Sequence, residues 1–261
     1  MTLMQLFGSL FIAYGPAFSL FLFTIAREPL RIIVMMAGMF FWLCSLLTSS
    51  VLWFVVLPLK GQISFGLTFS ILFQEIFRFI YYKLLRKAED GLQQFNQTSP
   101  EQQQQQQART VNGDSTSDKA RHGYAYVAGL GFGTMSGIFS FINVLADSKG
   151  PGTVGIHGDP HDFLITSAFL TSCFILLHIM WNVIFYWGFE TRRYWAVFIV
   201  VASHFLVSEL TLLNKDQLYQ VTLPIAYATL AIMSLFAFFI AGGSSRSIKQ
   251  AFSLQRSRYA L

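Results

Sequence analysis

Long apolar stretches follow one another along the chain, separated by shorter polar segments. Seven of them contain about 20 or more mostly apolar residues, the length that a helix needs to cross the hydrocarbon of a bilayer. They cover residues 3–26, 31–57, 63–83, 123–146, 162–188, 194–213 and 219–241. The pattern predicts an all-α polytopic membrane protein, in which one domain of seven transmembrane helices spans residues 1–261.

The composition agrees with this assignment. Hydrophobic residues make up 54% of the chain and charged residues only 12%, which leaves too little polar surface to coat a soluble globule of 261 residues. The first apolar stretch begins at Leu3, has no basic residue before it, and is too long for the apolar region of a cleavable signal peptide. We therefore expect it to be a retained membrane helix.

The basic residues predict the orientation. All of the 18 Lys and Arg residues except Lys60, Arg78, Lys149 and Lys215 fall in loops on one side of the seven-span arrangement. Cytosolic loops of membrane proteins are enriched in Lys and Arg. The amino terminus is therefore predicted to be lumenal or extracellular, and the tail 242–261 cytosolic.

One long polar segment, 84–122, lies between the third and fourth stretches. It contains the run Gln102 to Gln107 and many Ser, Thr and Asn residues. Such a composition cannot bury enough apolar area to fold alone. We expect a disordered cytosolic loop.

Small residues recur at four-residue spacing in the fourth stretch. Gly129, Gly133 and Gly137, extended by Ala125, form a stripe about 18 Å long on one helical face. Repeats of the G-x-x-x-G type let membrane helices approach closely. Packing within this chain and packing against a different protein are both open at this point.

Two histidines lie where lipid makes a polar group costly. His178 is about ten residues before the cytosolic end of the fifth stretch and His204 about ten residues after the start of the sixth, so each is about 15 Å deep. Adjacent antiparallel helices would bring them level. An imidazole at this depth needs a partner: a structural hydrogen bond, a lined cavity and a pocket for a partner peptide are the alternatives.

Glu75 and Arg78 form a second polar pair in the third stretch. Their i to i+3 spacing lets the side chains meet on one helical face. Breaking such a buried pair leaves an uncompensated charge, so we expect a structural ion pair, with contact to another subunit as the alternative.

The polar residues of the apolar stretches do not match the catalytic set of an intramembrane aspartyl protease. An intramembrane aspartyl protease needs two aspartates inside spans, whereas every aspartate here lies in a loop or at a span end. An intramembrane hydrolase or metal-dependent protease using His178, His204 and Glu75 is the alternative function. No H-E-x-x-H motif or third ligand accompanies the histidines, so no metal and no cofactor is predicted. Membrane lipid is an expected partner, and nucleic acid is not.

Several strings together resemble the anterior-pharynx-defective family, which supplies the seven-span subunit of gamma-secretase. The strings are Tyr14-Gly15-Pro16-Ala17-Phe18, Gln74 to Phe79 with Tyr81 to Leu85, the glycine stripe with Ser136-Gly137, the loop Gly150 to Asp159, and Arg192-Arg193-Tyr194-Trp195. The resemblance runs through all seven spans and departs mainly in the glutamine-rich loop and the short tail.

The resemblance implies a non-catalytic scaffold and not an enzyme. It implies assembly first with nicastrin and then with presenilin and the presenilin enhancer, in an intramembrane aspartyl protease that cleaves Notch and amyloid precursor proteins. The expected location is that of a multi-pass membrane protein of the endoplasmic reticulum, Golgi and plasma membrane. The catalytic aspartates would come from presenilin. By position, Gly129, Gly133 and Gly137 match the family's assembly stripe, and His178 and His204 match its paired intramembrane histidines.

A fainter similarity links the chain to the prenyl-protein intramembrane proteases. It rests on Gln74-Glu75 with Arg78, Phe174 with His178, and His204. The first motif of those proteases has paired glutamates. Gln74 breaks that pair, which favours a retired active site.

Overall fold

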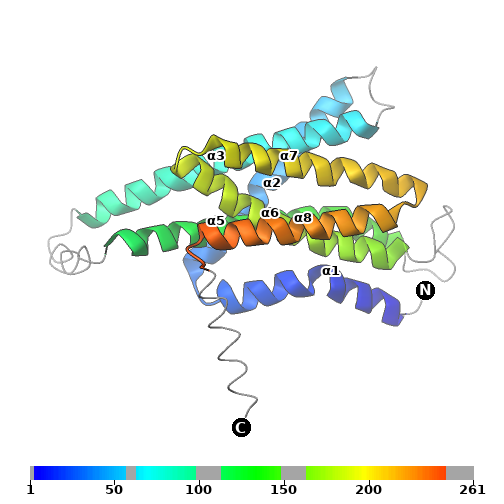
Figure 1. Cartoon of the computed structure of the whole chain (residues 1–261), viewed down its shortest axis with the longest axis horizontal. Helices are drawn as coiled ribbons and strands as arrows, with labels where there is room; N and C mark the ends of the chain where they lie inside the picture. The colour runs from blue at the N-terminus through cyan, green and yellow to red at the C-terminus, as the bar shows by residue number, and fades with distance from the viewer. Residues whose placement is uncertain (1–2, 57–62, 98–112, 148–162, 245–261) are drawn as a thin grey trace, which may run out of the picture.

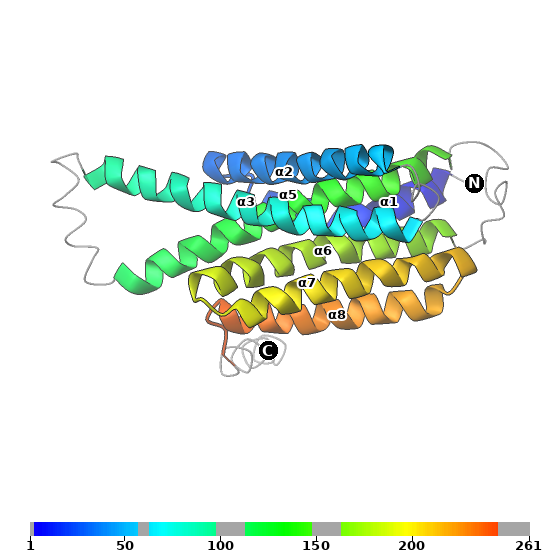
Figure 2. The same ribbon diagram turned by 90° about the horizontal axis from the view of Figure 1, so that it is seen from above.

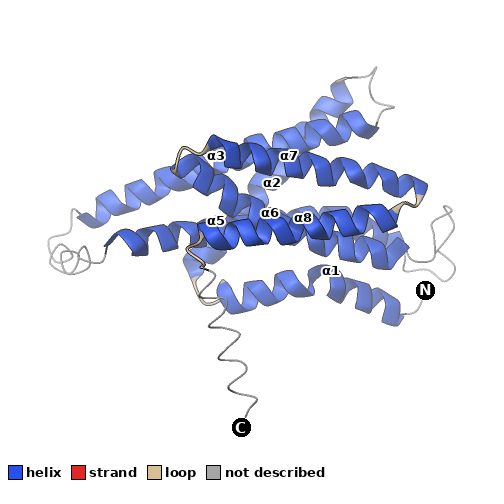
Figure 3. Ribbon diagram, in the orientation of Figure 1, coloured by secondary structure: helices blue, strands red, loops and turns tan. Residues whose placement is uncertain are grey.

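The computed structural model describes residues 3–56, 63–97, 113–147 and 163–244, and within these ranges the chain is helical (Figures 1 and 3). The elements are α1 (Leu3–Thr24), α2 (Pro29–Val55), α3 (Ile63–Gln97), α5 (Gly113–Asp147), α6 (Phe163–Glu190), α7 (Tyr194–Leu210), the 3-10 helix η2 (Thr211–Asp216) and α8 (Tyr219–Ile240). No strand occurs in the described ranges (Figure 3). The prediction of an all-α protein is confirmed.

Six of these helices are long and apolar enough to cross a membrane: α1, α2, α5, α6, α7 and α8. This fits a polytopic membrane protein. α3 is not in that group because Gln74, Glu75 and Arg78 lower the hydropathy of its apolar part. With 35 residues at about 1.5 Å per residue, however, it is longer than the hydrocarbon is thick. The count of seven spans and the orientation stay predictions.

α5 and α6 form the centre of the bundle. α6 packs against α5, α1, α7 and α8, while α5 also packs against α2, and α3 lies between α2 and α7 (Figure 2). Buried positions surround α6 on all sides. α1 and α8, by contrast, keep large apolar side chains exposed along their outer faces, as helices that face lipid do.

The loop predicted as disordered over 84–122 is shorter than expected. α3 continues to Gln97 and α5 begins at Gly113, and the two helices project together past the ends of the others (Figure 2). α3 stays helical beyond its apolar part because Leu85 remains buried and Arg86 pairs with Glu89 on its own helix and with Glu190 on α6. The glutamine run lies outside the described residues, as does the tail beyond 244.

Short turns set the order of neighbouring helices. Pro29 occupies the first turn of α2, where its missing N–H costs nothing. The turn between α6 and α7 places Arg192 in the left-handed region, at φ 56°. A Cβ at Gly188 would lie 2.9 Å from the side chain of Val197, so this glycine lets α7 fold back closely on α6.

Candidate functional site

The polar residues of α3 face the interior of the bundle. Arg78 is fully buried and Glu75 is 6% exposed. Because they lie one helical turn apart, the guanidinium reaches the carboxylate directly, with Nη1 of Arg78 2.9 Å from Oε1 of Glu75. The ion pair predicted from their spacing is present.

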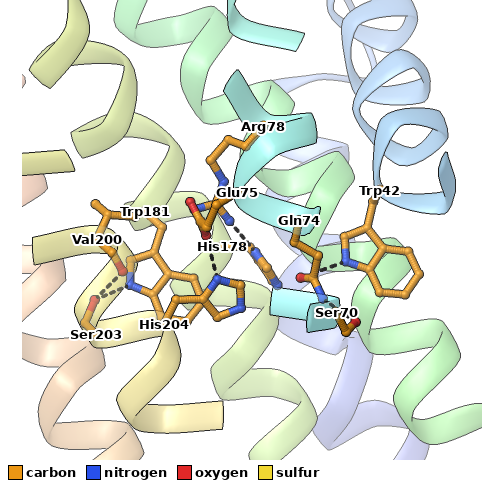
Figure 4. A network of polar contacts seen from close by, with 10 residues as sticks. All are labelled: Trp42, Ser70, Gln74, Glu75, Arg78, His178, Trp181, Val200, Ser203 and His204. Carbon is orange, nitrogen blue, oxygen red and sulfur yellow. Dashed lines mark hydrogen bonds and ion pairs between the residues drawn. The ribbon is translucent and has the colours of Figure 1, made fainter. Parts of the chain in front are cut away.

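The two histidines complete this pair from the other side. His178 on α6 lies with its Nδ1 2.9 Å from Nη2 of Arg78, and His204 on α7 lies with its Nδ1 2.6 Å from Oε1 of Glu75. The imidazole rings are 5.2 Å apart and nearly perpendicular. One network therefore joins α3, α6 and α7 at mid-helix (Figure 4).

The hydrogen-bonding capacity of each group fixes its part in the network. A guanidinium has donors only, so Nδ1 of His178 accepts from Arg78 and the ring proton sits on Nε2. A carboxylate accepts, so Nδ1 of His204 carries a proton and donates to Glu75. Each buried ion thus faces an opposite charge and a neutral partner, the arrangement that a buried ion pair requires.

Aromatic rings surround the network. The indole of Trp181 lies 4.3 Å from the His204 ring and meets His178 edge-on at 5.2 Å. Its Nε1–H donates to the Ser203 hydroxyl over 2.9 Å. The guanidinium of Arg78 lies 5.7–5.9 Å from the ring centroids of Phe132, Trp181 and Phe185, within the range of cation–π attraction. These rings fix the orientation of the polar groups.

Gln74 lies next to the network but links a different pair of helices, α2 and α3. Its Oε1 accepts from Nε1 of Trp42 on α2 over 3.2 Å, and its Nε2 reaches the Ser70 hydroxyl at 3.4 Å (Figure 4). The Trp42 and Trp181 contacts were not predicted from the sequence. The signal available was an indole within an apolar stretch, which needs a hydrogen-bond acceptor when it is buried.

A polar cavity of about 270 Å³ adjoins the histidines. Its walls come from α3, α5, α6, α7 and the start of η2, and its lining includes His178, His204 and Gln74. The rest of the lining combines five hydroxyl residues, Ser136, Ser140, Thr171, Ser208 and Thr211, with the apolar residues Leu67, Ile71, Leu170 and Phe174. The cavity alternative predicted from the depth of the histidines is therefore present, together with the structural hydrogen bonds.

Hydrolytic chemistry receives no support from this geometry. Glu75, the only carboxylate in the network, is bound by both Arg78 and His204, so it is not free to activate water. In the described ranges no group of three His, Cys, Asp or Glu residues is placed to hold a metal ion. The residues chosen for the hydrolase hypothesis are thus brought together, but each neutralises or orients another.

The glycine stripe packs within the chain. A Cβ at Gly129 would lie 2.7 Å from the Ile179 Cα, and one at Gly133 would lie 2.5 Å from the Ile175 carbonyl oxygen. Gly137 likewise meets the Ile175 side chain. The stripe lets α5 approach α6 at backbone distance, and Ala125, at the same spacing, is fully buried. Of the two alternatives, the structure selects packing inside the bundle.

A second close contact on the opposite face of α5 was missed. A Cβ at Gly131 would lie 2.3 Å from the Met35 carbonyl oxygen, and one at Gly38 on α2 would lie 2.8 Å from the Ala128 carbonyl oxygen. Gly131 is out of phase with the G-x-x-x-G repeat, so the motif did not include it. α5 is held at backbone distance by helices on two sides.

Comparison with known proteins places the chain in a well-defined group. The family model described as Aph-1 protein matches residues 4–244. The chain is 46% identical to gamma-secretase subunit Aph-1 of Drosophila melanogaster over 255 residues, which is 98% of this chain and 100% of that protein. It is 46% identical to gamma-secretase subunit Aph-1b of Danio rerio over 95% of this chain and 93% of that protein. With gamma-secretase subunit APH-1B of Homo sapiens the identity is 44%, over 100% and 98% of the two chains.

Proposed function

Since the chain belongs to the Aph-1 protein family, we propose that it is a non-catalytic scaffold subunit of gamma-secretase. In this role it stabilises presenilin and assembles with nicastrin and the presenilin enhancer. The complex cleaves Notch and amyloid precursor-type substrates with aspartates that presenilin supplies. The names of the relatives support membership of the complex.

The observation that carries the scaffold role is the use that the chain makes of its buried ions. Three helices are joined by bonds among Glu75, Arg78, His178 and His204. The polar groups of these residues therefore hold α3, α6 and α7 in one arrangement. A catalytic carboxylate has to face a substrate or water. A network of this kind instead supports a rigid surface against which other subunits can pack.

The proposal includes a topology. All seven α-helices cross the membrane, α3 among them, with the amino terminus lumenal or extracellular and the carboxyl tail cytosolic. The length of α3 and its place between α2 and α7 support its inclusion (Figure 2). The distribution of Lys and Arg supports the orientation. The protein resides in the endoplasmic reticulum, Golgi and plasma membrane.

The site residues take two roles in the proposal. Gly129, Gly133 and Gly137 support assembly indirectly, because they set the distance between α5 and α6 and so the shape that partners meet. His178 and His204 line the polar cavity while keeping their Nδ1 bonds. The Nε2–H of His178 is thus left to meet a polar segment of a partner subunit.

The test compares assembly with turnover. Tagged protein is purified in mild detergent, co-purifying subunits are quantified by mass spectrometry, and cleavage is expressed per mole of assembled complex. Glu75→Gln should lower the amount of complex but leave turnover per complex unchanged, whereas mutating the presenilin aspartates should abolish turnover without loss of assembly. Gly8→Ala, at a position with nothing within 4 Å of the added Cβ, is the control. Loss of turnover in a fully assembled Glu75→Gln complex would contradict a role for Glu75 in assembly alone.

A further inference from the structure

α1 and α2 diverge directly after the turn that joins them. α1 packs on α6 and α5, whereas α2 packs on α5 and α3, and α1 with α2 is not among the helix pairs in extended contact (Figure 1). Helices joined by so short a turn usually pack against each other. Here they leave between them a groove of about 540 Å³, with α5 as its floor.

The groove is built from one face of each helix. Phe18 and Phe21 line it from α1, and Met35, Met36 and Met39 line it from α2. Tyr14 and Thr134 supply the only hydroxyls, and that of Tyr14 already donates to the Gly137 carbonyl over 3.1 Å. Met side chains adapt their shape to irregular apolar ligands. The walls therefore suit a flexible hydrocarbon and offer little to a polar group.

The turn that joins α1 and α2 next to the groove and the start of α2 carry two arginines and one glutamate, Arg27, Arg31 and Glu28. Arg31 is committed there: it bonds to the Thr24 carbonyl over 2.7 Å and pairs with Glu28 over 2.7 Å. Arg27 is exposed and makes no ion pair or hydrogen bond with the part of the chain that the structure describes. An apolar groove beside an exposed cation without an acidic partner complements the two parts of an anionic phospholipid: the apolar walls suit an acyl chain, and the cation suits the phosphate.

We infer that the groove between α1 and α2 binds one anionic phospholipid from the leaflet on the side of the α1–α2 turn, with an acyl chain on α5 and the phosphate at Arg27. A transmembrane helix fits less well. Helix contacts in membranes favour small residues, whereas half of the ten residues that line this groove are Phe or Met.

The test uses the purified complex in nanodiscs of phosphatidylcholine that contain a photoreactive phosphatidylserine with a diazirine in its acyl chain. Labelled peptides are mapped by mass spectrometry. Labelling should concentrate on the groove residues of α1 and α2. Met36→Trp, which fills the groove from a residue 63% exposed, should abolish it, while Ile33→Trp, on the same helix, 62% exposed and outside the groove, should not.

The headgroup is tested by replacing the cation. One Arg at the surface should favour phosphatidylserine over a photoreactive phosphatidylcholine by about fivefold, and Arg27→Gln should remove that preference, while Arg192→Gln in the α6–α7 turn should retain it. Labelling spread evenly over the exposed residues of both helices would overturn the proposal. So would a photo-crosslink from position 36 to a helix of another subunit. The experiment measures labelling of this chain and not turnover, so its outcome is independent of cleavage activity.

Discussion

The contact between α5 and α6 at Gly133 can be tested with a single methyl group. In Gly133→Ala the new Cβ would lie 2.5 Å from the Ile175 carbonyl oxygen and 3.0 Å from the Ile175 Cα. A carbon and a carbonyl oxygen in contact are about 3.3 Å apart, so α6 has to retreat by about 0.8 Å there. Both atoms belong to backbone, so no rotamer change can relieve the clash.

The retreat carries a second cost because His178 is one turn further along α6. Its Nδ1 is 2.9 Å from Arg78, and a shift of about 0.8 Å would take that bond past the limit of about 3.2 Å for an N–H donor. Overpacking costs about 1–3 kcal/mol, and a lost bond to a charged group about 1.5–3 kcal/mol. We expect Gly133→Ala to lower the free energy of unfolding by about 2.5–6 kcal/mol.

The assay is reversible unfolding of the reconstituted subunit, by steric trapping or by titration with a denaturing detergent. Gly8→Ala serves as the control because no atom lies within 4 Å of its added Cβ, and alanine is the better helix former. It should unfold no earlier than the wild type. If Gly133→Ala were as stable as Gly8→Ala, the close approach of α5 and α6 described above would be incorrect.

Three further predictions use the same unfolding assay: two concern the polar network, and one concerns the neighbouring bond between Trp42 and Gln74. Arg78→Met should cost about 3–5 kcal/mol because it leaves Glu75 as a buried charge without its counter-ion, and combining it with Glu75→Gln should recover part of that loss; strict additivity would argue against the ion pair. His204→Asn should keep most of the stability that His204→Leu loses, since the amide nitrogen of Asn can stand in for Nδ1 as the donor to Glu75. Trp42→Phe should cost about 1–3 kcal/mol because Gln74 loses its indole donor, and an unchanged unfolding free energy would refute the bond.

The candidate site was predicted in parts and assembled only by the structure. The depth of His178 and His204 and the spacing of Glu75 and Arg78 can be read from position along a helix of known rise. Neither observation says that each histidine binds a member of the other pair, because that depends on the rotation of α6 and α7 about their axes. Gln74 was noticed only as the residue that breaks a pair of glutamates, whereas its partner Trp42 lies on a helix that no local pattern connects to it.

The ends of the helices were likewise predicted only in part from the sequence. The lengths of the apolar stretches predicted the bounds of α1, α2, α6 and α8, since the hydrocarbon thickness sets the length of a spanning helix. The polar continuation of α3 has the composition of a loop, so composition alone predicts disorder there. It remains helical because Arg86 finds partners on its own helix and on α6, a contact between residues about a hundred positions apart.

The class of the protein, the sites of its helices and the depth of its polar residues depend on local properties of the chain, so the amino-acid order suffices to predict them. The faces that the helices present to each other do not. In lipid a buried face and an exposed face can be equally apolar, and α6 is apolar all round, so no periodicity reveals which side is covered. Only the tertiary structure places Gly131 against α2, turns the glycine stripe toward α6, and separates α1 from α2.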